Sequence, residues 1–169
     1  MNDHHEPLNA DLLVTLRPVV AADEPLLFEI YASTRAEEMA MVPWPREQQE
    51  QFLRMQFAAQ QEHYPKLHPD ANHDIIMLNG RAVGRLYVAR TKDYIEIMDI
   101  TLLPQDRNLG VGTSLIKGLI AEASASRPLR IYVETFNPSL RLFERLGFKV
   151  VGEEGIHRLM EWVPGSPAI

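Results

Sequence analysis

Cysteine is absent from the 169 residues of this chain. Without it the protein cannot form disulfide bonds, bind a metal through thiolates or use a cysteine nucleophile. Long apolar runs are missing as well, because no stretch approaches the roughly 20 residues that a membrane-spanning helix needs. The first residues, MNDHHEPLNADLL, contain neither the basic nor the apolar region of a signal peptide. These absences predict a cytoplasmic protein that has no membrane partner.

Basic residues are outnumbered, with 17 Lys and Arg against 23 Asp and Glu, and the net charge is −6. Because the basic residues form no long block, nucleic acid is not an expected partner. An acidic surface suits a cationic small molecule or peptide better. The histidines show no metal-binding spacing such as H-E-x-x-H. His63, His68 and His73 fall in a polar linker, where we expect surface residues, and no metal site is assigned.

The elements that are present predict one mixed α/β domain. No repeat, low-complexity stretch or shift in composition marks a second domain, and 12–163 are the expected bounds, with flexible termini at 1–11 and 164–169. Apolar periodicity, turn residues and caps give the order β-α-α-β-β-β-α-β-α-β, with one or two strands at the end. The predicted strands cover 12–17, the 73–90 hairpin around Asn79-Gly80, 94–103, 129–135 and 148–163; the predicted helices cover 22–40, 46–64, about 111–126 and 137–148. The sheet should be central, mixed and mostly antiparallel, with helices flanking it.

A glycine-rich segment, RNLGVGTSL, lies between a predicted strand and the helix that follows. A phosphate loop of the Walker type needs a lysine that this segment lacks, and a dinucleotide fingerprint needs a third glycine where Leu115 stands. Bare backbone at a helix N-terminus still offers unpaired N–H groups and a positive dipole end to an anion. The alternative is a simple strand-to-helix turn in which glycine satisfies the backbone angles.

Two motifs together make the chain resemble the GNAT N-acyltransferase superfamily. The first is the Q/R-x-x-G-x-G/A turn, here RNLGVG at 107–112, and the second is NPSLRLFERLGF at 137–148. They occur in the family's order and at about its spacing, and the predicted element order matches the family's layout. The resemblance implies an acyl-CoA co-substrate, most often acetyl-CoA, and transfer of the acyl group to a primary amine of a small molecule or peptide.

The resemblance also implies where acyl-CoA binds. Its pyrophosphate would lie on the backbone amides of the glycine turn, and its pantetheine arm would pair with the end of the strand 94–103. Asn137 and Phe143 match positions that contact the arm in family members, although Asn137 is also a good helix N-cap and Phe143 and Phe148 are also good core residues. The implied cofactor-binding residues are Ile100, Leu102, Arg107, Leu109, Gly110, Val111, Gly112, Thr113, Asn137 and Phe143.

Glu96 and Asp99 are the candidate catalytic bases, since family members often carry an acid on this strand that takes the proton of the amine. Glu96 is preferred because it lies eleven residues before Arg107, the spacing found in some members. Strand alternation places Asp99 on the opposite face, so the two should not share a site unless a bulge intervenes. Either acid could instead be a solvent-facing side chain or part of a structural ion pair.

One position departs from the family pattern. Many members have tyrosine at the place of Phe143, and its hydroxyl protonates the leaving thiolate, which phenylalanine cannot do. Another group such as Tyr132, or water, would have to serve, unless the thiolate leaves unprotonated. This departure keeps a second hypothesis open, a catalytically idle acyl-CoA-binding sensor or interaction module. A nucleotide-binding protein is a more distant third.

The acceptor amine in this family usually binds between the first two helices and their linker. Tyr31, Glu37, Glu38 and Trp44 fall in that region, where the two glutamates could attract a cation and Trp44 could form a wall. An exposed helix end and a packed linker would explain the same residues. A homodimer is one of the assemblies that the resemblance implies.

Overall fold

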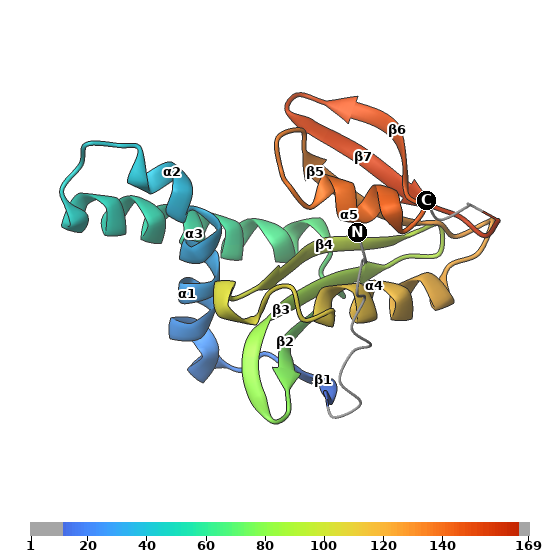
Figure 1. The fold of residues 1–169 in the computed structure, drawn as a ribbon, viewed down its shortest axis with the longest axis horizontal. Coiled ribbons are helices and arrows are strands. Elements are labelled where there is room, and N and C mark those ends of the chain that lie inside the picture. Colours follow the sequence, from blue (N-terminus) through green and yellow to red (C-terminus); the bar gives the residue numbers. More distant parts are fainter. Residues whose placement is uncertain (1–11, 166–169) are drawn as a thin grey trace, which may run out of the picture.

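The strands form one seven-stranded sheet in the order β1-β2-β3-β4-β5-β7-β6 (Figure 1). The structure is a computed structural model that describes residues 12–165. Every neighbouring pair of strands is antiparallel except β4 and β5, which are parallel and are connected through α4. The predicted α/β class and the mixed, mostly antiparallel sheet are confirmed.

The strands are β1 (Val14–Pro18), β2 (Asn72–Leu78), β3 (Arg81–Arg90), β4 (Ile95–Leu102), β5 (Leu129–Glu134), β6 (Lys149–Glu154) and β7 (His157–Trp162). The helices are α1 (Glu24–Thr34), α2 (Ala36–Ala40), α3 (Arg46–Leu67), α4 (Val111–Glu122) and α5 (Leu140–Arg145). Short 3-10 turns precede α1 and follow β4. All the elements predicted from the sequence exist, and the C-terminal segment forms two strands.

Several boundaries differ from the prediction. The expected helix 22–40 is divided into α1 and α2 at Arg35, whose φ of −109° and ψ of 1° leave the helical region. Helix α3 continues past Pro65, because a proline in the last turn removes only one backbone donor. Helix α5 begins at Leu140 rather than at Asn137, whose side chain forms a turn with Ser139. Of the termini predicted to be flexible, 1–11 and 166–169 lie outside the described residues.

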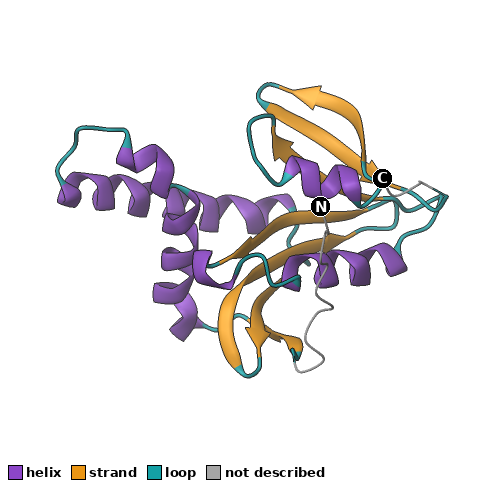
Figure 2. Ribbon diagram, in the orientation of Figure 1, coloured by secondary structure: helices purple, strands orange, loops and turns teal. Residues whose placement is uncertain are grey.

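The two faces of the sheet are covered by different helices, so the fold has a large and a small core (Figure 2). The larger core joins the sheet to α4 and α5 and contains Ile97, Ile116 and Phe143. The smaller one joins it to α1 and α3 through Tyr31 and Phe57. Side chains of one strand alternate between these cores, so a residue's register decides which helices it meets.

Strand β4 carries a bulge at Met98. Tyr87 of β3 pairs with Asp99, but the next residue, Val88, pairs with Ile97, so Met98 is an extra residue on β4. The extra residue reverses the alternation beyond it. Glu96 and Asp99 therefore lie on the same face of the sheet, the face covered by α1 and α3. The expectation that the two acids lie on opposite faces was therefore wrong, because a bulge does intervene between them.

Strands β4 and β5 separate directly after Ile97, where the bulge begins. Their parallel pairing in the described structure joins 95–97 to 129–131 and stops there. The rest of β4, from Met98 to Leu102, keeps β3 as its neighbour, where Gly84 allows a close approach: an added Cβ would lie 2.2 Å from the carbonyl oxygen of Thr101. Beyond Ile97, β4 thus has a backbone edge that faces β5 without pairing with it. In residues 12–165 no helix is long and apolar enough to cross a membrane.

Candidate active site

The glycine turn leads into α4 with its backbone donors uncovered. Gly110 is the N-cap, and its φ of 84° lies in the left-handed region that glycine adopts without strain. Among the described residues, no side chain caps this helix. The first helical hydrogen bond runs from Ser114 N to Gly110 O. The N–H groups of the three residues before Ser114 are therefore left for an anion at the positive end of the helix dipole.

One ion pair and one side-chain hydrogen bond fix the turn in place. The buried carboxylate of Asp106 is held by Arg81 of β3, with Nη2–Oδ1 at 2.7 Å. Arg107 donates from Nε to the carbonyl oxygen of Leu102 at 3.0 Å, while the side chain remains exposed. The arginine therefore ties the turn to the end of β4 and keeps its terminal nitrogens available. Leu109 is exposed at the tip of the turn.

The other predicted cofactor residues lie around the separation of β4 from β5. The side chains of Ile100 and Leu102 are partly buried against the larger core. Phe143 is only 2% exposed and packs edge-to-face on Phe148, with ring centroids 5.2 Å apart. Asn137 is exposed, and its Oδ1 accepts hydrogen bonds from Ser139. Phe143 is thus a residue of the hydrophobic core in this structure. Its contact with acyl-CoA stays a prediction.

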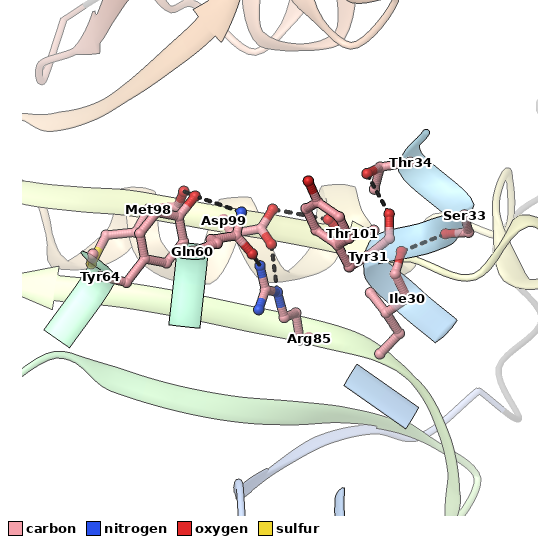
Figure 3. Close-up of polar contacts among 10 residues, drawn as sticks. All are labelled: Ile30, Tyr31, Ser33, Thr34, Gln60, Tyr64, Arg85, Met98, Asp99 and Thr101. Carbon is pink, nitrogen blue, oxygen red and sulfur yellow. Dashed lines mark hydrogen bonds and ion pairs between the residues drawn. The ribbon is translucent and has the colours of Figure 1, made fainter. Parts of the chain in front are cut away.

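Asp99 follows the bulge and lies at the centre of a polar network (Figure 3). Its Oδ2 accepts a hydrogen bond from Arg85 Nε at 2.5 Å, and its Oδ1 accepts one from Thr101 Oγ1 at 2.9 Å. The side chain of Asp99 is 22% exposed, whereas Arg85 is buried. The carboxylate is therefore held at two oxygens by rigid strands and is still accessible to solvent.

Helix α3 completes this network with two polar side chains. Gln60 accepts a hydrogen bond from Arg85 Nη2 at 2.6 Å and donates to the hydroxyl of Tyr64. The Tyr64 hydroxyl lies 3.5 Å from the carbonyl oxygen of Met98, at the bulge. Burial, and to a lesser extent the negative charge of Asp99, raises the pKa of Tyr64 to about 12. This phenol therefore keeps its proton at neutral pH and acts as a donor.

Glu96 lies in a different setting, where β4 and β5 are still paired. Its Oε1 accepts from Arg130 Nε at 2.9 Å, and its Oε2 lies 3.3 Å from His68 Nε2, directly after α3. The guanidinium of Arg130 stacks over the ring of Tyr94 at 3.4 Å. With both oxygens engaged and the side chain 9% exposed, Glu96 joins β4, β5 and the end of α3.

Removing this carboxylate should therefore weaken the fold. We expect Glu96→Ala to lower the free energy of unfolding by about 2 kcal/mol, because it leaves Arg130 without its partner beside a half-buried histidine. Urea denaturation followed by circular dichroism would measure the change. Glu62→Ala is the matched control, since Glu62 pairs with Lys66 on the exposed surface of α3 and should cost less than about 0.5 kcal/mol. Equal effects of the two substitutions would contradict the role of Glu96.

The histidine prediction was correct for His63 and wrong for the other two. His63 is exposed. His68 is half-buried beside Glu96, and His73 stacks on Tyr87 with ring centroids 4.3 Å apart. Burial, together with the charge of Arg85, lowers the pKa of His73 to about 4, so it is neutral at pH 7. Within residues 12–165 no group of three or more potential ligands could hold a metal ion.

The residues predicted for the acceptor are not brought together. Tyr31 is buried between α1 and α3 and donates to Gln56 at 3.1 Å, on the same side of the sheet as Asp99. Trp44 lies in the linker between α2 and α3 and packs against Phe52. Glu37 and Glu38 are exposed on α2. Only Tyr31 among these four is close to the polar network, and Figure 3 shows it with Asp99 and Thr101.

Several residues of the site carried no signal in the sequence. Arg85 and Tyr64 belong to a strand and a helix whose patterns are explained by packing alone, and His68 and Arg130 reach Glu96 from elements far apart in the chain. A local pattern cannot report such contacts, because the bulge and the strand order create them. Only the alternation of β3 could have marked Arg85, as a charge placed within a buried strand.

Chemically, the arrangement offers an anion seat, an unpaired strand edge and a carboxylate around one separation between strands. The N-terminus of α4, where an anion could bind, follows β4 after the 3-10 turn and the glycine turn, and Asp99 lies on the face of the sheet covered by α1 and α3. An extended ligand with an anionic end could therefore bind along β4 and present its other end near Asp99. Three side chains in the same region could donate or accept a proton: Asp99, Tyr64 and Tyr132. Tyr132 lies on β5 and is 40% exposed.

Solved structures with the same fold include several acetyltransferases. The chain is similar to the PaiA N-acetyltransferase from Thermoplasma acidophilum in complex with coenzyme A, with a TM-score of 0.66, 17% identity and coverage of 88% of this chain and 98% of that one. It is also similar to a GNAT family acetyltransferase from Elizabethkingia anophelis with acetyl-CoA bound, with a TM-score of 0.55, 16% identity and coverage of 92% of this chain and 99% of that one. A third similar structure is the ribosomal-protein-S18-alanine N-acetyltransferase from Escherichia coli, with a TM-score of 0.54, 19% identity and coverage of 88% of this chain and 91% of that one. At this level of identity the likeness establishes the fold.

Comparison at the level of sequence gives the family. No curated protein matches the chain. The family model of the acetyltransferase (GNAT) domain, however, matches residues 41–165, which is most of the sequence and includes both motifs, the separating strands and Asp99. The resemblance inferred from the glycine turn and from the segment 137–148 is thereby confirmed: the chain belongs to the GNAT acetyltransferase family.

Proposed function

We propose that this protein transfers an acyl group, with acetyl as the expected one, from acyl-CoA to a primary amine by direct attack. One observation carries the proposal: β4 and β5 separate directly after Ile97, between the uncapped N-terminus of α4 and the carboxylate of Asp99. Membership of the acetyltransferase family, and matched structures that contain coenzyme A or acetyl-CoA, support acyl-CoA as the co-substrate.

The residues around the separation of β4 from β5 fit such a molecule. The pyrophosphate is assigned to the amides of Val111, Gly112 and Thr113, where N–H groups and the helix dipole both favour an anion. The Cβ position of Gly112 has no atom closer than 3.9 Å, so the approach to these amides is open. The pantetheine arm is assigned to the unpaired edge of β4, Met98–Leu102, as an additional strand. This arm would carry the thioester towards the bulge and Asp99.

The reaction then follows from the groups at the bulge. The neutral amine nitrogen attacks the thioester carbonyl carbon, and collapse of the tetrahedral intermediate breaks the C–S bond and releases CoA thiolate. The amine proton is assigned to Asp99, directly or through a water molecule. Amide N–H groups or the Tyr64 hydroxyl, which keeps its proton at neutral pH, would stabilise the negative charge that develops on the carbonyl oxygen.

The geometry favours Asp99 over Glu96 as the base, although the sequence had suggested the reverse preference. Glu96 lies where β4 and β5 are still paired, and both of its oxygens are occupied by Arg130 and His68. Asp99 lies where the strands have separated, is more exposed, and still has two of about four lone-pair sites free. A base must reach the amine, and Asp99 has the better access.

The thiolate must also be accommodated without the usual tyrosine. Tyr132, exposed on β5 just beyond the last residue that pairs with β4, is the candidate replacement for the hydroxyl that Phe143 lacks. We expect Phe143→Tyr to leave kcat unchanged or to raise it, because it adds a proton donor while nearly preserving the volume of the ring. Steady-state kinetics with acetyl-CoA would measure the effect. A large loss of kcat in a variant with unchanged melting temperature would contradict the expectation that a hydroxyl at this position is tolerated in the reaction.

The amine acceptor is best sought with a broad panel. Release of free thiol from acetyl-CoA should be measured with polyamines, amino acids, lysine-containing peptides and peptides with a free N-terminal alanine. The last group is included because one matched enzyme is named for the alanine of ribosomal protein S18. Turnover with any of these amines would support the proposal. Tight CoA binding without turnover on any amine would favour the idle sensor, and protection by ATP or NAD rather than CoA would favour the nucleotide-binding alternative.

A further inference from the structure

Arg85 is a charged side chain buried to 2% exposure in the middle of β3. Its guanidinium makes two side-chain contacts, from Nε to Asp99 Oδ2 at 2.5 Å and from Nη2 to Gln60 Oε1 at 2.6 Å. It also lies over the ring of Tyr64, with Cζ 6.0 Å from the centroid. Arg85 therefore joins the candidate base on β4 to helix α3.

Stability alone does not account for an arginine at this place. Taking a guanidinium and a carboxylate out of water is expensive, and a well-packed apolar pair is often as stable or more so. The neighbouring positions of β3 are filled by Leu86, Tyr87 and Val88, so an apolar residue would suit the strand. What the arginine adds is orientation, because its planar guanidinium holds Asp99 through Nε and is itself held by Gln60 through Nη2, at a fixed angle between the two hydrogen bonds.

Among the described groups around Asp99, Arg85 is the one that supplies a positive charge to orient its carboxylate. The titratable groups packed around the pair include Tyr31 on α1, Tyr64 on α3, His73 on β2 and Tyr87 on β3. Burial raises the pKa of Tyr64 to about 12 and lowers the pKa of His73 to about 4, so these two side chains are neutral at pH 7. Among the described residues, no other arginine or lysine forms a hydrogen bond with Asp99. Thr101 holds the second oxygen, but it supplies no charge.

We propose that Arg85 is the positioning residue of this site: it fixes the orientation of the Asp99 carboxylate beside the β4 bulge, so that this carboxylate faces the incoming amine. The inference rests on the proposed function, in which Asp99 takes the proton. Arg85 itself touches neither substrate, and it acts through Asp99 and through its anchor Gln60.

A double-mutant cycle tests this dependence. Steady-state kinetics would compare the native protein with R85M, D99N and R85M/D99N, using acetyl-CoA and the panel amine with the fastest thiol release. We expect R85M to lower kcat about tenfold or more, since it removes the charge but keeps most of the stem, while the Kd for acetyl-CoA stays within about twofold. In the D99N background, R85M should lower kcat no further. R85K should restore part of the activity.

Folding and site effects are kept apart by controls. Arg54→Met removes an arginine of α3 whose partner, Glu50, is exposed, and it should leave kcat unchanged. Melting temperature and acetyl-CoA binding check each variant, and R85K replaces R85M in the cycle if R85M does not fold. Native kcat in R85M, or effects of R85M and D99N that simply multiply, would overturn the positioning role. Native activity in D99N would instead overturn the proposed base, and the role of Arg85 with it.

Discussion

Gly112→Leu is expected to abolish acetyl-CoA binding while the protein stays folded. The backbone around Gly112 would accept a side chain in the free protein, because an added Cβ meets nothing closer than a methyl group of Leu102 at 3.9 Å. With acyl-CoA present, the same side chain would occupy the approach to the first N–H groups of α4. Losing two or three charge-assisted hydrogen bonds there should weaken binding by about 3 kcal/mol or more, which is over about 100-fold in Kd.

A matched glycine on the same helix gives the control. An added Cβ at Gly118 has no neighbour within 4 Å, and this residue is exposed six positions further along α4. Gly118→Leu should therefore keep native affinity and leave the helix as stable or slightly more so. Gly110 is less suitable for the test, because its φ of 84° would strain any other residue and confuse folding with binding. Isothermal titration calorimetry would measure Kd. Undiminished affinity in Gly112→Leu would show that the glycine turn connects β4 to α4 without binding the pyrophosphate.

The parts of the fold that the sequence predicted are those with local causes. Asn79-Gly80 forms the hairpin between β2 and β3 with φ of 50° and 80°, as the dipeptide indicates. Gly110 begins α4 in the left-handed region, and the segment 140–145 is helical. Each of these features depends on residues adjacent in the chain. The pairing of the two motifs then gave the family without any knowledge of contacts.

The network around Asp99 could not be predicted in the same way. The bulge at Met98 adds one residue to β4 relative to β3, and neither strand has a glycine or proline at that point to mark it. Without the bulge, alternation separates Asp99 from Glu96, and spacing to the glycine turn then favours Glu96. Arg85 and Gln60 are 25 residues apart and meet only because α3 packs across β3. The polar network around Asp99 therefore depends on tertiary contacts, whereas the glycine turn proposed to bind the pyrophosphate depends on residues adjacent in the chain.

The second large effect is expected at Asp99. Asp99→Asn keeps the size and one hydrogen-bond acceptor of the side chain but cannot take a proton from an ammonium group. We expect kcat/KM for the amine to fall by about 100-fold or more, within the range of a lost general base, while the Kd for acetyl-CoA stays near its native value. Steady-state kinetics and calorimetry on the same preparation would measure both.

Glu96→Gln is the companion variant for this test, because the two acids share one face of the sheet yet differ in their partners. Glutamine still accepts a hydrogen bond from Arg130, so the junction of β4 with β5 should persist and kcat/KM should fall less than about tenfold. Asp99→Asn also leaves Arg85 without its counter-charge, so the melting temperature is needed to show that the fold survives. If Glu96→Gln proved to be the slower enzyme of the two, the base would lie at the paired end of β4 after all. The acceptor would then have to reach a carboxylate that Arg130 and His68 enclose, and His68 would become the route by which the proton leaves.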